Sequence, residues 1–424
     1  MLDINYIRQY PDVVKENLRK RQIPEHLVHL DSVLKNDELW RSLKQKVDQA
    51  RARRNKISAE INDAKKAKKD ASRLIKEAAD IPKIIAEAEK ELLELQEKIK
   101  ACLMKIPNLT HDSVPYGKDD TQNKVIRTVG RKPSFKFTPL SHVDLMLKNN
   151  WVDLDRAAKI SGARWYFLKG DLAMLEIALV QYAMDFLRSK KFTPVIPPFM
   201  MLGKAYEGVT SLDDFENVMY KVQGEDLYAI ATSEHPLTAM YMDEVLEESQ
   251  LPIRMAGFST NFRKEAGAHG KDQKGIFRVH QFNKVEQIVF CKPEESWHFH
   301  EELLKNALEF FESLGLYLQV VNVCTGDLGI IAAKKYDIEA WYPVQNAFRE
   351  VVSCSNCTSY QAVRSNIRFQ HGQERHYVHT LNSTCVATTR ALVAIIENFQ
   401  AADGSVEVPK ALQKYTGFKV MKHG

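Results

Sequence analysis

The chain has 424 residues, long enough for two or three domains, and its 44% hydrophobic and 27% charged residues are typical of a soluble globular protein. No run of 18 apolar residues occurs, and the first residues lack the apolar core of a signal peptide, so we expect neither a membrane span nor export. The six scattered cysteines predict a reducing, cytoplasmic location. The one CxxC pair, Cys354 and Cys357, has no second pair or nearby histidines, so no zinc site is expected.

Residues 1–30 are predicted to form a short helical lead-in to two long helices. Apolar residues recur at steps of mostly three and four from Leu39 to Ala64, and again from Ile81 to Ile106, which is the spacing of a coiled-coil seam. The polar stretch 65–80 is predicted to hold the turn between the helices, and Pro82 suits the restart of the second helix. The pattern predicts an antiparallel helical hairpin, an arm of roughly 45 Å at the usual helical rise.

The two halves of this arm differ in charge. Residues 41–76 carry thirteen Lys or Arg against four acidic residues, whereas residues 83–105 carry five of each sign. A rigid rod with one basic face matches a phosphate backbone, and A-form RNA in particular is recognised by its shape and backbone. The alternative is a solvated coiled-coil surface. Such surfaces usually balance the two signs, so the charge pattern favours nucleic acid.

The rest of the chain is predicted to form an α+β core. Residues 1–108 are interpreted as an N-terminal domain, 109–165 as a linker with the first elements of the core, and 166–424 as the main domain. Helices and strands alternate irregularly and with hairpins, which favours an antiparallel sheet covered by helices over a doubly wound parallel sheet. The predicted helices are 171–190, 294–314 and one that starts near residue 387, and the predicted strands are 218–221, 227–230, 253–259, 316–323 and one that carries Glu350.

A hairpin with a long loop is predicted near the middle of this core. Residues 276–288 alternate with the period of a strand and place Arg278, Phe282 and Glu286 on one face. Residues 266–275, rich in glycine and lysine, have the character of a loop. A face with a cation, an aromatic ring and a carboxylate suits a nucleotide and an amino acid better than a core. The alternative is a solvated sheet edge with scattered charges.

The sequence lacks the usual phosphate-binding motifs, a Walker loop or a GxGxxG turn after a strand. Arginines are therefore the candidates for holding phosphates, because a planar guanidinium matches phosphate oxygens. Glu350 and Ser353 offer the hard oxygen ligands that Mg²⁺ prefers. The candidate arginines are Arg263, Arg278 and Arg390, and small polar groups that suit a zwitterion with a hydroxyl occur at Thr232, Glu234, Asn382 and Thr384.

Three motifs and several shorter signatures resemble a known family. FTPVIPPFM resembles motif 1 of the class II aminoacyl-tRNA synthetases, NFRKE with IFRVHQFNKVE resembles motif 2, and STCVATTRALVAIIENFQ resembles motif 3. TSEHPL, CTGDLG, KYDIEAW, FREVVSCSNCTSYQ and LNST are similar to signatures of the seryl-tRNA synthetases, in wording closest to archaeal and eukaryotic members. An N-terminal helical hairpin is also a hallmark of that family, so the resemblance extends over essentially the whole chain.

The resemblance implies a cytoplasmic homodimer that activates L-serine with ATP and Mg²⁺ and transfers it to tRNA(Ser), with tRNA(Sec) left open as a second acceptor. Arg263, Arg278 and Arg390 would be the catalytic residues. By the same resemblance, ATP would be bound by Arg263, Lys264, Glu265, Arg278, Val279, Phe282, Glu350, Val351, Val352, Ser353 and Arg390, with Mg²⁺ on Glu350 and Ser353; serine by Thr232, Ser233, Glu234, Glu286, Asn382 and Thr384; and tRNA by Arg51, Arg53, Arg54, Lys65, Lys66, Lys68 and Lys69, with Lys271 and Lys274 near its acceptor end.

Two other functions stay open at this point. A related protein could activate an amino acid for a carrier protein, although such proteins usually lack a long basic arm. A non-catalytic RNA-binding descendant is the other alternative, and the candidate catalytic residues argue against it. Some positions depart from the family pattern: Val363 stands where the first arginine of a pair is usual, Val344 and Lys190–Lys191 where a glycine is common, and Ser233 where alanine is usual.

Overall fold

The computed structural model describes residues 1–210, 218–265 and 274–422, and the predicted contact residue Lys271 lies outside them. The chain divides into two compact units, Met1–Pro107 and Asn108–Gly424. Within the described residues, no helix is both long enough and apolar enough to cross a bilayer.

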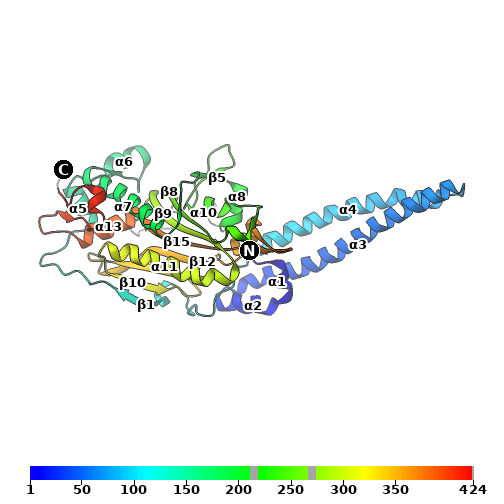
Figure 1. The fold of residues 1–424 in the computed structure, drawn as a ribbon, viewed down its shortest axis with the longest axis horizontal. Coiled ribbons are helices and arrows are strands. Elements are labelled where there is room, and N and C mark those ends of the chain that lie inside the picture. Colours follow the sequence, from blue (N-terminus) through cyan, green and yellow to red (C-terminus); the bar gives the residue numbers. More distant parts are fainter. Residues whose placement is uncertain (211–217, 266–273, 423–424) are drawn as a thin grey trace. The chain divides into compact units, whose positions relative to one another are not determined.

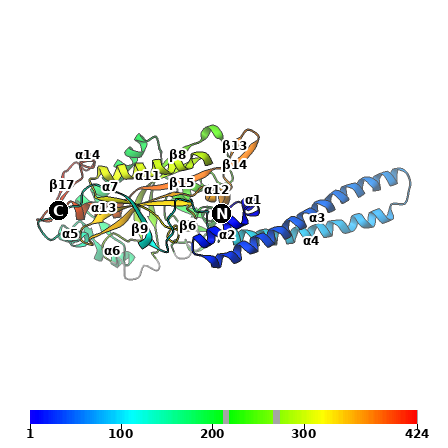
Figure 2. The ribbon, with the colours of Figure 1, turned by 90° about the horizontal axis from the view of Figure 1, so that it is seen from below.

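The first unit consists of helices, and its two longest lie antiparallel to each other (Figure 2). Apolar side chains on facing sides form the seam between them, with Val47 and Ile57 from the first helix packed against Ile81, Ile85 and Leu92 from the second. The antiparallel arm is therefore as predicted. Its helices are α1 (Ile4–Gln9), α2 (Pro11–Lys20), α3 (Leu27–Lys66) and α4 (Ser72–Leu103), with a short 3₁₀ turn at Pro24–His26.

The turn of the arm is shorter than the sequence predicts. The second helix begins at Ser72, and Pro82 lies inside it instead of marking a restart. Leu74 and Ala78 pack against the seam, so they extend its three- and four-residue spacing toward the tip. This packing outweighs the polarity of the surrounding residues, because most helical stability in proteins comes from an apolar face that finds a partner.

An eight-stranded sheet forms the centre of the second unit (Figure 1). Neighbouring strands are antiparallel except for one parallel pair, β4 and β8, at one edge. The predicted antiparallel sheet is thus confirmed. In spatial order the strands are β1 (Lys124–Val129), β10 (Leu318–Asn322), β11 (Lys334–Tyr342), β12 (Ala347–Asn356), β15 (His379–Ala387), β9 (Gln281–Cys291), β8 (Ile253–Phe262) and β4 (Thr193–Val195).

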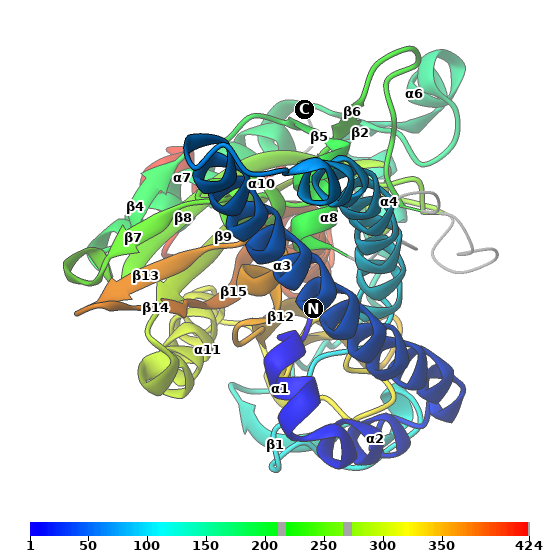
Figure 3. The same ribbon diagram turned by 90° about the vertical axis from the view of Figure 1, so that its right-hand side faces the viewer.

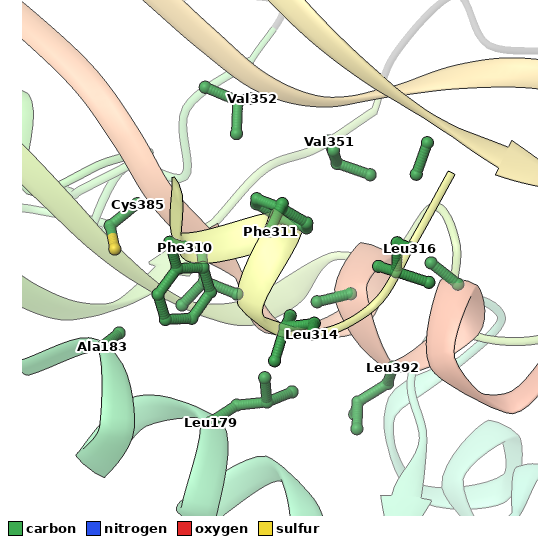
Figure 4. Packing of buried hydrophobic residues seen from close by; sticks show 14 of the residues in the cluster. Leu179, Ala183, Phe310, Phe311, Leu314, Leu316, Val351, Val352, Cys385 and Leu392 are labelled. Atoms are coloured by element: carbon green, nitrogen blue, oxygen red, sulfur yellow. The ribbon is translucent and has the colours of Figure 1, made fainter. Parts of the chain in front are cut away.

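Three helices, α7 (Gly170–Ser189), α11 (Ser296–Ser313) and α13 (Thr388–Asn398), share the main hydrophobic core with the sheet. Figure 4 shows this core, where Phe310 and Phe311 of α11 lie among side chains of α7, β12, β15 and α13. Val285 and Val289 of β9 belong to the same core, whereas Ile288 belongs to a second cluster with Leu237. Alternate residues of β9 therefore face opposite sides of the sheet, and even-numbered residues point away from the three helices.

Smaller elements complete the second unit. A β-hairpin, β13 (Arg368–His371) with β14 (Glu374–Tyr377), lies beside β7 (Val245–Glu247) and was not predicted (Figure 3). The short helices are α5 (His142–Lys148), α6 (Leu154–Ser161), α8 (Gly203–Val209), α10 (Glu234–Ala239), α12 (Tyr360–Ser365) and α14 (Gln413–Thr416). The short strands are β2 (Val152–Asp153), β3 (Phe167–Leu168), β5 (Met200–Leu202), β6 (Leu227–Ala229), β7 (Val245–Glu247), β13 (Arg368–His371), β14 (Glu374–Tyr377), β16 (Val406–Glu407) and β17 (Val420–Met421).

The predicted central hairpin exists, with one correction. Strands β8 and β9 pair antiparallel along their whole lengths. The second strand begins at Gln281, five residues later than the alternating pattern predicts. The residues before it are held by other contacts, such as the backbone bonds from Arg263 to His280 and from His280 to Arg164.

Candidate functional site

A pocket of about 510 Å³ opens on the face of the sheet opposite the three core helices. Strands β9, β12 and β15 form its floor, and the segment that leads into α10 forms one wall. Most of the predicted site residues line this pocket, although they are spread over more than 150 positions in the sequence. Those on its lining are Thr232, Glu234, Arg263, Glu265, Arg278, Val279, Phe282, Glu286, Glu350, Val351, Ser353, Asn382, Thr384 and Arg390.

Three predicted site residues are not on the lining. Ser233 is fully buried behind it, where its hydroxyl donates to the carbonyl of Gly257 at 3.2 Å. Val352 belongs to the hydrophobic core on the other face of the sheet. Lys264 lies next to the pocket and donates its backbone N–H to the carbonyl of Val218. The side chains of these three residues therefore do not line the pocket.

One end of the pocket holds a buried carboxylate, Glu286, whose oxygens are fully engaged. Lys284 Nζ lies 3.0 Å from it, the Thr232 hydroxyl donates to it, and the Ser233 hydroxyl lies at 3.4 Å. Lys284 and Glu286 are two apart on β9, so they point to the same face. A buried carboxylate needs such partners, because an unpaired buried charge is costly.

A second carboxylate, Glu234, lies at the same end. Burial and the nearby charge of Glu286 raise its pKa to about 7. Two carboxylates with one lysine leave this end of the pocket with a net negative charge when both are ionised. Such a site is suited to a small cation, such as the ammonium group of an amino acid.

The other end of the pocket is rich in arginine. Arg390, in the first turn of α13, lies 3.3 Å from the carboxylate of Glu350 and donates to its backbone carbonyl at 2.9 Å. The guanidinium of Arg263 lies over the ring of Phe282, 5.1 Å from its centroid. Burial, and then the charge of Arg390, lower the pKa of Arg263. Two cations that repel each other in one pocket would both be stabilised by an anion placed between them.

Arg278 and Phe277 lie at the same end. Arg278 donates to Glu265 at 2.9 Å, so the two predicted site residues are brought together. The guanidinium groups of Arg349 and Arg390 both lie over the ring of Phe277, 4.4 and 5.4 Å from its centroid. The predicted strand pattern placed Phe277 away from the site. The structure corrects this, because the chain before Gln281 is not a strand and does not alternate faces.

A β-bulge brings Glu350 and Ser353 to the same side of β12. Residues three apart in a regular strand point to opposite faces. Here Glu350 pairs with Glu339 and Val352 pairs with Ile338, which leaves Val351 as an extra residue. Both Glu350 and Ser353 therefore reach the pocket.

Two oxygen donors of this kind fit a hard cation such as Mg²⁺, which takes few protein ligands and keeps water or phosphate oxygens as the others. Burial raises the pKa of Glu350, but the charges of Arg390 and Lys335 outweigh it and hold the pKa below its usual value. The carboxylate is thus ionised at neutral pH, as a metal ligand must be. The described ranges contain no cluster of three or more His, Cys, Asp or Glu side chains that could hold a metal ion.

Several pocket residues were missed by sequence reasoning. Lys284 and Cys357 line the pocket, Gln361 reaches Glu234 from behind, and Asp337 faces Ser353 across the β11–β12 pair. Lys284 could have been found, since it lies on the predicted face of the hairpin. The others lie within the signatures KYDIEAW and FREVVSCSNCTSYQ, but which of their side chains reach the site depends on how the strands pair.

The candidate RNA-binding residues on the arm fall into two groups. Arg51 donates to Glu89 at 2.5 Å, and Arg53 makes two hydrogen bonds to Glu77 at 2.8 and 2.9 Å, so both join α3 to α4. The others are exposed and form no ion pair among the residues that the structure describes; they are Arg54, Lys65, Lys66, Lys68 and Lys69. Lys65 and Lys66 end α3 and Lys68 and Lys69 follow it, so these four lie at the tip of the arm, whereas Arg54 lies further back in α3.

Both units match known proteins. Residues 218–399 match the family model described as tRNA synthetase class II core domain (G, H, P, S and T), and residues 1–110 match the model described as seryl-tRNA synthetase N-terminal domain. The serine–tRNA ligase of Methanoregula boonei is 56% identical over 418 residues, which cover 98% of each chain. The seryl-tRNA synthetase of Pyrococcus horikoshii, solved with ATP, is 48% identical with a TM-score of 0.95 over 100% of both chains. The cytoplasmic serine–tRNA ligase of Naegleria fowleri, solved with AMP, is 38% identical with a TM-score of 0.88 over 100% of this chain and 99% of the other.

Proposed function

The chain belongs to the seryl-tRNA synthetase family, and we propose that it is a serine–tRNA ligase whose pocket binds serine at its carboxylate end and ATP at its arginine end. The carboxylate of serine attacks the α-phosphorus of ATP, an O–P bond forms, and pyrophosphate leaves with the bonding electrons. A ribose hydroxyl at the 3′ end of tRNA(Ser) then attacks the carbonyl carbon of the seryl-adenylate, and AMP leaves.

The first step is supported by the positions of the arginines. Phosphoryl transfer needs in-line positioning and charge stabilisation more than a protein nucleophile. In this proposal Arg263 neutralises the α-phosphate, and Arg278 and Arg390 hold the rest of the triphosphate. Phe282 offers an aromatic face for the adenine.

The serine end is supported by its charge and its hydrogen-bonding groups. Glu234 receives the ammonium group, and Thr232, Glu286, Asn382 and Thr384 surround the rest of the amino acid. A site that hydrogen-bonds a substrate hydroxyl strongly rejects an analogue without it, because the polar groups of the site are then left unpaired. Discrimination against alanine rests on this physical principle.

Mg²⁺ would be held by the Glu350 carboxylate and the Ser353 hydroxyl, which the bulge at Val351 brings to one side. When bound, it neutralises charge on the phosphate oxygens. The chain itself orients these two oxygens and keeps Glu350 ionised through Arg390 and Lys335.

The arm is proposed to bind tRNA. Its unpaired candidate cations, Arg54 along α3 and the lysines of 65–69 at the tip, are exposed, so a phosphate backbone can reach them. A homodimer is proposed because residues 192–200 resemble motif 1. This segment contains β4, the edge strand of the described sheet, which has a neighbouring strand on one side only.

The observation that carries the proposal is the pairing, in one pocket, of an acidic end with an arginine end next to Glu350 and Ser353. The test is serine-dependent exchange of pyrophosphate into ATP, followed by charging of tRNA(Ser). We expect both activities, with alanine giving less than about 1% of the exchange seen with serine. Exchange without charging would point to a carrier-protein activity, and no exchange would refute an enzymatic function. Charging of tRNA(Sec) in the same assay decides whether it is a second substrate.

A further inference from the structure

Gln361, in the short helix α12, connects three separate parts of the molecule through its side-chain amide. Its nitrogen donates to the Glu234 carboxylate at 2.9 Å and to the backbone carbonyl of Val209 at 3.1 Å. Its oxygen accepts from the Thr380 hydroxyl at 2.6 Å. The side chain is fully buried. The amide nitrogen of Gln361 therefore has two hydrogen-bond acceptors, and its oxygen has one donor.

These bonds fix which way the amide points. If the amide rotated by half a turn, its oxygen would face the Val209 carbonyl and the Glu234 carboxylate. All three groups are hydrogen-bond acceptors, so neither contact could form a hydrogen bond. The Thr380 hydroxyl would also lose its acceptor. Leaving buried polar groups without partners is costly. The amide nitrogen is thus held against Glu234.

We propose that Gln361 is a positioning residue for the amino-acid site: it holds Glu234 in the orientation and the ionised state that receive the ammonium group of serine. The inference rests on the proposed function. It assigns a role in the first step to a residue that does not line the pocket but reaches the site through Glu234.

The charges around Glu234 explain why such support is needed. Glu286 and Lys284 face it from β9, Arg263 from the end of β8, and the Cys357 thiol from the segment after β12. Burial and Glu286 raise the pKa of Glu234, whereas Lys284, the hydrogen bond from Gln361 and Arg263 lower it. The donor from Gln361 is a direct hydrogen bond to the carboxylate, so its loss favours the protonated form, which cannot pair with an ammonium group.

The test is the variant Gln361→Met, which keeps the length of the side chain but has no hydrogen-bond donor. In serine-dependent pyrophosphate exchange at pH 7, we expect the KM for serine to rise about tenfold, with the KM for ATP changed by less than about twofold. The acid limb of kcat/KM for serine should move up by about one pH unit, because a lost hydrogen bond to the ionised form raises the pKa of Glu234. Above this limb the variant should recover much of its activity.

Two further variants make the result specific. Thr380→Val keeps Gln361 but removes the hydroxyl that orients its amide, and it should shift the acid limb in the same direction by a smaller amount. Val363→Ala, on the same helix but away from Glu234, is the packing control and should leave the limb in place. Thermal melting shows whether each variant is folded. If Gln361→Met does not fold, the shift in Thr380→Val decides the question.

The outcomes separate this inference from the proposed function. No exchange by the unaltered protein would refute the proposed function itself. Normal exchange, together with an unmoved acid limb in Gln361→Met, or with equal losses for serine and ATP at every pH, would overturn the positioning role and leave the proposed function intact.

Discussion

The arm and the pocket both contain many charged side chains, but they use charge in opposite ways. On the arm, the lysines near the tip are exposed and repeated. Arg51 and Arg53 each pair with a carboxylate of the neighbouring helix and with one of their own helix. In the pocket, charged groups of both signs lie close together, and the pKa of Glu234 or Glu350 depends on several neighbours at once. Water screens charges on the arm, whereas the interior strengthens them in the pocket.

This difference has a direct consequence for substitutions. Exposed charges that act together contribute small, roughly additive amounts to binding, and losing one leaves the others in place. Buried charges that face a reacting group act as a set, so losing one affects all of them. The comparison predicts large effects of single changes in the pocket and small effects on the arm.

The largest effect is expected from Arg263→Ala. Removing a fixed cation next to the α-phosphate should lower kcat for pyrophosphate exchange by about 10²–10³-fold, the range found when one donor to a developing charge is removed. Arg263→Lys keeps the charge without the planar fork and should recover only part of the loss. The matched control on the arm, Arg54→Ala, should leave exchange unchanged. A loss of less than about tenfold in Arg263→Ala would contradict the assignment of Arg263 to the transition state.

An intermediate effect is expected when four lysines at the tip of the arm are changed together to alanine: Lys65, Lys66, Lys68 and Lys69. If they contact tRNA phosphates, kcat/KM for charging should fall by about tenfold or more at physiological salt, and the slope of log K against log salt should decrease by about three to four. Serine-dependent exchange, which needs no tRNA, should stay the same. Equal losses in exchange and charging would show that the changes act on folding and not on RNA binding.

Much of the fold was predictable because its signals are local. The three- and four-residue spacing of the arm and the alternation of β8 and β9 depend on residues near one another in the sequence. The turn of the arm was misplaced because Leu74 and Ala78 bury a face that looks polar when each residue is judged alone. The start of β9 was misplaced because the alternation continues through Phe277 and Arg278, whereas the strand itself begins only at Gln281.

The candidate site was predictable only where a motif names its residues. Alternation by itself puts Glu350 and Ser353 on opposite faces, and they meet only because Val351 bulges out of register with β11. Gln361 lies 127 positions from Glu234, and no periodicity connects them. Such contacts depend on how distant strands and helices pack, and no local pattern in a single sequence predicts that packing.

The smallest effect is expected from releasing a paired cation on the arm. Glu77→Gln removes the carboxylate that accepts from two of the three guanidinium nitrogens of Arg53 and leaves, among the described ion pairs, only the more distant Glu60, at 3.7 Å, so Arg53 becomes more available to a phosphate. We expect the KM for tRNA to fall by about twofold at low salt, with exchange unchanged. Glu94→Gln, which neutralises another exposed carboxylate of α4 without a partner among the described ion pairs, is the matched control. If both variants lower the KM for tRNA equally, the change in net charge alone accounts for the tighter binding. If only Glu77→Gln does, the geometry of Arg53 matters, and the arm then resembles the pocket more closely than its exposure suggests.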